Sequence, residues 1–216
     1  MSHDDAQRNE AVPAKAPSSE TRGLEVPDQR PGGLIIFLNG TSSSGKSSIA
    51  RELLQILDAS FFHMPVDAFH AMRSDRDIPD DHLQAEIDRT AMGFHRAVAG
   101  MAVAGNNVVV DHVLSQRWRL LDCLALFTAE NVVLVGVHCP LPELERREQI
   151  RGDRTPGLAA RQFEQVHAHG IYDIKCDTSK NTPGEIAEQI KSTLAQRPTP
   201  TAFTRLKVAL RAGNPN

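Results

Sequence analysis

The stretch FLNGTSSSGKSSIA, Phe37 to Ala50, decides the fold of this chain. It contains a glycine, four further residues and then Gly-Lys-Ser, which is the spacing G-x-x-x-x-G-K-[ST] of a phosphate-binding loop. The apolar run LIIFLN before it is typical of a buried strand, and SSIARELLQIL after it has the spacing of an amphipathic helix. A simple glycine- and serine-rich turn is the other interpretation, and the strand and helix on either side favour the phosphate loop.

The chemistry of phosphate binding explains this spacing. Glycines let the loop curl so that successive backbone N–H groups point at phosphate oxygens, and the start of the following helix adds partial positive charge. We expect Lys46 to place its ammonium on the β- and γ-phosphates, and the Ser47 hydroxyl can ligate Mg²⁺. The sequence therefore predicts ATP and Mg²⁺ as cofactors. The nucleotide-binding residues are expected to be Gly40, Thr41, Ser42, Ser43, Ser44, Gly45, Lys46, Ser47 and Ser48.

Composition limits the classes of function. The 216 residues include 24 basic and 27 acidic side chains, a net charge of −3, and 40% hydrophobic residues, which suffice for a buried core. This charge balance and the single Tyr and single Trp do not suit nucleic-acid binding, so no nucleic-acid partner is expected. No apolar run approaches membrane-spanning length, and the N-terminus MSHDDAQRNE lacks the apolar segment of a secretory signal. Three cysteines without disulfide or metal spacing agree with a cytoplasmic protein that has no membrane partner.

Apolar runs alternate with helical patterns between residues 33 and 196. This alternation predicts one α/β domain, in which a parallel sheet has helices on both faces. The expected strands are 34–38, 61–64, 108–110, 132–138 and 174–176. The expected helices are 47–57, 80–104, 116–127, 143–150, 158–167 and 183–194.

The two ends of the chain differ from this pattern. Residues 1–32 are polar, contain scattered prolines and lack periodicity, so we expect a disordered tail. Residues 197–216 form a second tail, in which Phe203, Leu206 and Leu210 have helical spacing. A short helix that packs on its own domain is preferred here over a basic helix that binds a partner or a membrane surface.

Carboxylates follow two of the expected strands. Asp67 lies just after strand 61–64, in FFHMPVDAF, and because ligands gather beyond the carboxyl ends of parallel strands it should face the phosphate loop. A kinase needs a group that takes the proton of the acceptor hydroxyl, so Asp67 is the predicted general base or orienting group. A helix N-cap is the alternative for Asp67. Asp111 ends VVVD, which resembles a Walker B element, and could hold Mg²⁺ or contact substrate.

The run ERREQIRGDRTPG, residues 145–157, is rich in arginine and follows the fourth expected strand. Arginines that close over a moving phosphoryl group neutralise its charge and exclude water. We therefore predict an arginine-rich lid, with catalytic roles for Arg151 and Arg154 and a nucleotide contact for Arg147. A solvated helix with i,i+4 pairs, such as Glu143 with Arg147, is the alternative for part of this segment.

Two smaller motifs have structural explanations. His167 and His169 could suggest a metal pair, yet no third ligand lies at a suitable spacing, so a structural or substrate-edge role is preferred. In DTSKNTPGEIAEQI, residues 177–190, Thr182 and Glu185 have the pattern of a capping box at the start of a helix. The same loop is also a candidate for contact with adenine.

From about Leu34 to Leu194 the chain resembles the chloramphenicol phosphotransferase-like proteins. The resemblance rests on the order and spacing of FLNGTSSSGKSS, PVDAF, AGNNVVVDHVL, VGVHCPLPELERRE, RGDRTPG and QVHAHGIYDIKCDTS. It implies a P-loop kinase fold with a five-stranded parallel sheet of order 2-3-1-4-5. It also implies transfer of the γ-phosphoryl group of ATP to a hydroxyl, with Asp67 as the base and Arg154 as the lid arginine, and with Lys46 and Ser47 in the phosphate loop.

The chain departs from the family pattern in two places. The segment between Asp67 and Asp111, which should build much of the acceptor pocket, is shorter than in the drug-modifying archetype, and His112 replaces a second acidic residue. Two identities of the small-molecule acceptor therefore agree with the sequence: chloramphenicol, or another alcohol such as a sugar or nucleoside. A nucleotide-binding regulatory protein with slow hydrolysis is the alternative from another class, and it would need neither Asp67 nor the lid arginines. The sequence does not indicate an oligomeric state.

Overall fold

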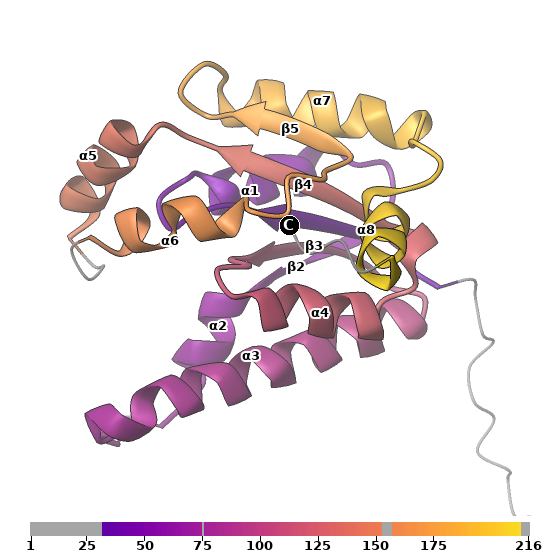
Figure 1. Cartoon of the computed structure of the whole chain (residues 1–216). Coiled ribbons are helices and arrows are strands. Elements are labelled where there is room, and N and C mark those ends of the chain that lie inside the picture. The colour runs from indigo at the N-terminus through magenta and orange to yellow at the C-terminus, as the bar shows by residue number, and fades with distance from the viewer. Residues whose placement is uncertain (1–31, 75, 153–156, 213–216) are drawn as a thin grey trace, which may run out of the picture.

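The computed structural model describes residues 32–74, 76–152 and 157–212 (Figure 1). Five strands in these ranges form one parallel sheet of order β2-β3-β1-β4-β5, which confirms the predicted fold and strand order. The strands are β1 (Ile35–Asn39), β2 (Phe61–Pro65), β3 (Asn107–His112), β4 (Val132–His138) and β5 (Ile174–Asp177).

Helices cover both faces of the sheet. Figure 1 shows α7 on one side and α3 and α4 on the other, and the strand arrows point toward α5 and α6. The short helix α2 follows β2 directly and was not among the expected helices. The helices are α1 (Lys46–Ile56), α2 (Val66–Ala71), α3 (Asp80–Val103), α4 (Arg117–Leu126), α5 (Leu141–Arg151), α6 (Leu158–Val166), α7 (Pro183–Ala195) and α8 (Ala202–Arg211), with a 3-10 turn at Ala129–Asn131.

The central strands are buried because helices cover both of their faces. All five residues of β1 are buried, as are all but the last of β4, which explains why both read as continuous apolar runs. Successive side chains point to opposite faces, so Phe37 joins the core layer of α3, α4 and α8, whereas Leu38 joins that of α1 and α7. Burial of each such side chain stabilises the fold by about 1.5–3 kcal/mol.

The strand register brings polar residues to one edge of the sheet. Asn39, at the end of β1, pairs with His112, and Leu38 pairs with Asp111. Pro65, the last residue of β2, also lies opposite Asp111. The loop after β1, the helix after β2 and the carboxylate near the end of β3 therefore meet beyond the carboxyl ends of the strands, where ligands bind in open α/β sheets.

Helix α8 belongs to the main core, although it lies beyond the 33–196 range expected for the kinase domain. Phe203 and Leu206 are buried in the layer of α3 and α4, and the ring of Phe203 stacks on that of Phe127 with centroids 6.2 Å apart. Asp173 Oδ1 accepts a 2.6 Å hydrogen bond from the backbone N–H of Ala202, which joins the start of α8 to the segment before β5. The apolar face of this helix thus packs on its own domain.

The three cysteine thiols are not joined in disulfides. Cys123, Cys139 and Cys176 are free and buried. Burial raises the pKa of Cys176 to about 12, so this thiol stays protonated at neutral pH. Of the helices described, none combines the length and the apolar character that crossing a membrane would require.

Candidate active site

The phosphate loop joins β1 to α1, and its glycines are required by its shape. A Cβ at Gly40 would lie 2.5 Å from the Val137 carbonyl oxygen and 2.6 Å from Ser44 Oγ. Gly45 has a φ of +93°, in the left-handed region that glycine enters without strain. The loop therefore curls over the N-terminus of α1, where backbone N–H groups and the helix dipole attract anions. The predicted loop residues 40–48 are brought together here.

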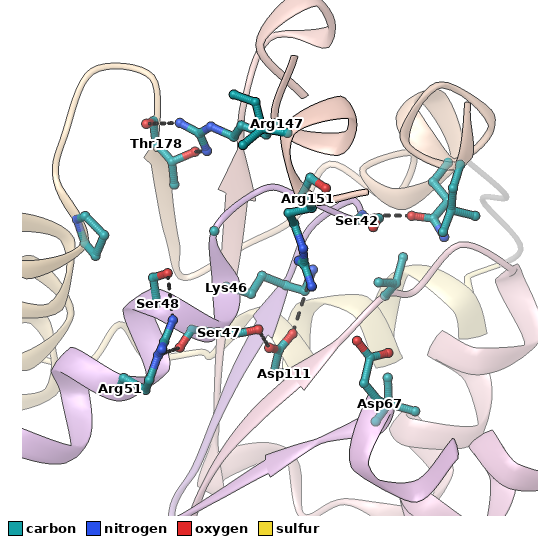
Figure 2. Close-up of a pocket in the computed structure, with 18 of the residues that line it drawn as sticks. Ser42, Lys46, Ser47, Ser48, Arg51, Asp67, Asp111, Arg147, Arg151 and Thr178 are labelled. Carbon is teal, nitrogen blue, oxygen red and sulfur yellow. Dashed lines mark hydrogen bonds and ion pairs between the residues drawn. The ribbon is translucent and has the colours of Figure 1, made fainter. Parts of the chain in front are cut away.

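Lys46, Ser47 and Asp111 form the polar centre of the site (Figure 2). Lys46 Nζ donates a 2.8 Å hydrogen bond to the Thr41 carbonyl oxygen and lies 3.8 Å from Asp111 Oδ1. Ser47 Oγ donates a 2.5 Å hydrogen bond to Asp111 Oδ2. A hydroxyl and a carboxylate this close offer two oxygen ligands to Mg²⁺, which usually keeps several waters and binds phosphate oxygens as well. These two side chains therefore fit the predicted metal.

Buried polar atoms near this centre also fit a polar ligand. Ser43 Oγ, Ser44 Oγ and His63 Nε2 have no hydrogen-bond partner among the described residues, and His63 Nε2 lies 4.0 Å from Asp111 Oδ2. An unpaired buried polar group costs about 1–3 kcal/mol, so such atoms favour a site that phosphate oxygens and hydrated metal would complete. Burial lowers the pKa of His63, partly opposed by Asp111, so the ring is neutral at neutral pH.

The Ser47 hydroxyl and the Asp111 carboxylate suit Mg²⁺ better than zinc. Within residues 32–74, 76–152 and 157–212, no three His, Cys, Asp or Glu side chains lie together in a metal-binding arrangement. Zinc sites in proteins use three or four such ligands, whereas Mg²⁺ is commonly held by one or two carboxylates together with substrate phosphates.

Asp67 lies in the first turn of α2, two residues after the N-cap Pro65. The alternative that Asp67 is itself the N-cap was therefore wrong. Figure 2 shows its carboxylate facing the same space as Lys46 and Asp111. Because Pro65 pairs with Asp111 across β2 and β3, the residues that follow β2 are held beside Asp111.

These groups line one cavity of about 620 Å³, a volume typical of small-molecule sites. One part of the wall surrounds the phosphate loop and suits a nucleotide. The other part combines apolar side chains with the Asp67 carboxylate. The first part includes Gly45, Lys46, Ser48, Arg51, Arg147, Thr178 and Pro183, and the second includes Val66, Asp67, Val113, Leu158 and Gln162.

Arg147 is fixed between α5 and the loop after β5. Its Nε donates to Glu143 Oε1 at 2.7 Å, which is the i,i+4 pair considered from the sequence. Its two terminal nitrogens donate to Thr178 Oγ1 at 3.0 Å and to the Thr178 carbonyl oxygen at 2.9 Å. Thr178 Oγ1 in turn donates to the Ser44 carbonyl oxygen at 2.9 Å. Arg147 therefore makes the helical pair and also joins α5 to Thr178 beside the phosphate loop.

Of the other two arginines predicted for the lid, Arg151 and Arg154, only Arg151 lies among the described residues. Arg151 is the last residue of α5 and lines the cavity, and Figure 2 shows it extending toward Lys46. Arg154, the predicted lid arginine, lies outside the described residues together with the rest of 153–156.

His112 does not line the cavity, although it follows Asp111 directly. Its Nε2 lies 3.1 Å from His95 Nε2, and His95 Nδ1 lies 2.7 Å from Asp122 Oδ2. Complete burial lowers the pKa of His112 well below its usual value, so it remains neutral. The strand alternation turns His112 toward the core layer of α3, while Asp111 lines the cavity.

His167 and His169 belong to an aromatic cluster behind the phosphate loop. The His167 ring stacks on His138 with centroids 3.9 Å apart, and its Nδ1 shares a 2.7 Å hydrogen bond with Tyr172 Oη. The same hydroxyl accepts a 2.8 Å hydrogen bond from Asn39 Nδ2. The His169 ring also packs on that of Tyr172, with centroids 4.6 Å apart, so both histidines have a packing role next to Asn39, which precedes Gly40.

Two residues of the site were missed in the sequence. Gln162 Oε1 accepts a 2.9 Å hydrogen bond from the backbone N–H of Ser42, and it lines the cavity. Asn39 donates to the Val166 carbonyl oxygen and to Tyr172, and it accepts from the backbone N–H of Leu114. Neither residue belongs to a motif with fixed spacing, because their partners come from distant parts of the chain.

Comparison with known proteins agrees with this geometry. The profile of the chloramphenicol phosphotransferase-like protein family matches residues 33–195. Proteins of Mycobacterium tuberculosis strains CDC 1551 and H37Rv, each named as a candidate O-phosphotransferase, are 30% identical over 200 residues, which cover 82% of this chain and 89% of theirs.

Solved structures share the fold at low sequence identity. The APS kinase of M. tuberculosis in complex with AMPPNP and APS has a TM-score of 0.60 at 19% identity, covering 77% of this chain and 99% of that one. A gluconokinase from Sinorhizobium meliloti 1021 has a TM-score of 0.54 at 17% identity, covering 87% and 100%. These likenesses identify a P-loop kinase fold, and the profile match identifies the family. The chain belongs to the chloramphenicol phosphotransferase-like family.

Proposed function

We propose that this protein transfers the γ-phosphoryl group of ATP to a hydroxyl of a small molecule. Family membership and fold make it a phosphotransferase that acts on a hydroxyl, and the proposal adds ATP as the donor and a small alcohol as the acceptor. The observation that carries the proposal is that a single cavity joins the phosphate loop to the Asp67 carboxylate. A protein that only senses nucleotide would not need a carboxylate across from the phosphates.

The proposed reaction places the acceptor hydroxyl between Asp67 and the γ-phosphate. As the acceptor oxygen bonds to the γ-phosphorus, the bond from that phosphorus to the β–γ bridging oxygen breaks and ADP leaves. Asp67 orients the hydroxyl and takes its proton. Lys46 neutralises charge on the β- and γ-phosphates, and Ser47 and Asp111 would hold Mg²⁺, which supplies further neutralisation when bound.

Arginines have two roles in this proposal. Arg151 and Arg154 stabilise the charge on the moving phosphoryl group and help to exclude water, which would otherwise accept it. Arg147 contacts the nucleotide from the wall that it forms with Thr178. The start of helix α2, with Val66 and Asp67, then forms the acceptor side together with Val113, Leu158 and Gln162.

Chloramphenicol is the first acceptor to test, because the family is named after its phosphotransferase. Sugars and nucleosides are the alternatives, since a gluconokinase and other small-molecule kinases share the fold. The test incubates purified protein with ATP, Mg²⁺ and chloramphenicol, glucose or adenosine, and follows the products by mass spectrometry and ³¹P NMR. We expect one phosphorylated alcohol and an equal amount of ADP. Slow ADP formation without a phosphorylated alcohol would contradict the proposal and favour a nucleotide-binding regulatory protein.

A further inference from the structure

Gln162 occupies an unusual position between the phosphate loop and the acceptor side of the cavity. Its Oε1 accepts the backbone N–H of Ser42 at 2.9 Å, and because that partner is a donor, the carboxamide oxygen must face the loop. The Nε2 group, with two N–H donors, is then the end left for other partners. No hydrogen bond from Nε2 is found within the described part of the chain, and Gln162 lines the cavity.

The surroundings of Gln162 differ from those of the nucleotide. Leu158 lies one helical turn before it on α6 and lines the same cavity, as do Val66 and Val113 from beyond β2 and β3. Asp67 is the carboxylate on this side. The wall therefore offers apolar surface, one strong hydrogen-bond acceptor and one neutral amide donor.

We propose that Gln162 is a specificity-determining residue that donates a hydrogen bond from Nε2 to an oxygen of the acceptor, in the cavity that it shares with Asp67. This inference rests on the proposed function. The acceptor is then an alcohol that carries a second oxygen, a hydroxyl or a carbonyl, and an apolar body for Leu158, Val66 and Val113. The phosphates already have the loop N–H groups and Lys46, so a neutral amide among apolar side chains suits the acceptor better.

A pair of substitutions separates this role from a purely structural one. Gln162→Glu keeps an oxygen for the Ser42 N–H but loses both amide donors, whereas Gln162→Met loses both kinds of contact at similar length. Gln165→Met is the matched control, because Gln165 lies on the same helix, is exposed and does not line the cavity. The acceptor probe is whichever of chloramphenicol, glucose or adenosine the wild-type protein phosphorylates. ATP affinity is measured by calorimetry with Mg²⁺ present.

We expect both Gln162 variants to raise the acceptor KM about 10-fold, as for loss of one hydrogen bond in a substrate pocket. ATP affinity of Gln162→Met should stay within about 3-fold of wild type, and Gln165→Met should match wild type throughout. Two results would overturn the proposal: a wild-type acceptor KM in Gln162→Glu, which would leave only a loop contact, or an equal loss of ATP affinity in Gln162→Met. Failure of the proposed function is seen separately, because wild-type protein would then phosphorylate none of the three alcohols, and the inference would fall with it.

Discussion

Ser47 Oγ donates its proton to Asp111 Oδ2 over 2.5 Å, which joins the start of α1 to the end of β3. The contact spans 64 positions of sequence and follows from the parallel pairing of β1 with β3, in which Leu38 lies opposite Asp111. A hydroxyl that donates its proton still has lone pairs for a cation. The pair is therefore the expected Mg²⁺ site, and Asp111 supplies its charge.

Replacing Asp111 with asparagine should weaken the binding of Mg²⁺ that accompanies ATP. The amide carries no negative charge, so the Mg²⁺ concentration for half-maximal ATP binding should rise about 10-fold or more. Calorimetric titration of ATP over a series of Mg²⁺ concentrations measures this value. Asp58→Asn is the control, because Asp58 is 88% exposed and pairs with Lys191 away from the cavity. An unchanged Mg²⁺ requirement in Asp111→Asn would refute the assignment.

Two neighbouring arginines should differ in their effect on ATP binding. Arg147 holds Thr178 of the loop after β5, whereas Arg146, which also lines the cavity, forms its hydrogen bonds with Glu143 and is 59% exposed. Arg147→Ala should therefore raise the KM for ATP about 10-fold, and Arg146→Ala by no more than about 3-fold. Steady-state kinetics at saturating acceptor compare the two. An equal increase of the KM for ATP in both variants would show that the contact between Arg147 and Thr178 does not matter for ATP binding.

Substitution of a glycine by alanine tests the packing of Tyr172 behind the phosphate loop. A Cβ at Gly136 would lie 2.9 Å from the Tyr172 ring, and Tyr172 holds Asn39 just before the phosphate loop. Gly136→Ala should lower the free energy of unfolding by about 1–3 kcal/mol, because the ring must shift. Gly100→Ala should raise it by about 0.5–1 kcal/mol, since Gly100 lies inside helix α3 with open space around it. Urea unfolding of both variants measures these changes, and a stabilised Gly136→Ala would contradict the described packing.

The histidine cluster should make stability depend on pH. Burial lowers the pKa of His167 to about 3 and that of His169 to about 4, while an unfolded histidine titrates near 6.5. Between about pH 4 and 6.5 the unfolded chain therefore binds more protons, so the free energy of unfolding rises with pH in this window. Their contribution is fully present above about pH 6.5 and is lost as the pH falls toward the folded values.

We expect the urea midpoint to be lower at about pH 5.5 than at about pH 7, and His167→Gln should reduce the difference. His82→Gln serves as the control, because the His82 side chain is 71% exposed. A midpoint that does not fall on acidification, or a His167→Gln variant with the wild-type pH dependence, would argue against the neutral buried cluster.

Much of the fold could be predicted from local patterns. Strands β1 and β4 are buried on both faces, and such strands need continuous apolar runs, which the sequence displays at 34–38 and 132–138. The phosphate loop has fixed spacing because its glycines must allow the backbone to curl, so the loop could also be predicted. Helix α2 is only six residues long and lacks a repeated apolar pattern, so it was considered only through the alternative that Asp67 caps a helix.

Contacts between distant segments could not be predicted from such patterns. Gln162 meets Ser42 across 120 positions, and Arg147 meets Thr178 across 31, through helices whose placement depends on packing. The side chain of His112 points into the core because successive residues of a strand face opposite sides of the sheet, and Asp111 faces the cavity. The proximity of Asp67 to the phosphate loop was inferable from strand order, while its catalytic role stays a prediction.

The most direct test of the account is the substitution Asp67→Asn. Asparagine keeps the size of the side chain but takes up protons poorly, so it should remove the base while leaving the nucleotide contacts in place. Single-turnover transfer from ATP to the accepted alcohol, together with ATP affinity from calorimetry, measures both properties. The account predicts transfer about 100-fold slower or worse with ATP affinity within about 3-fold of wild type. Wild-type transfer by Asp67→Asn would contradict the proposal that this carboxylate serves the acceptor hydroxyl.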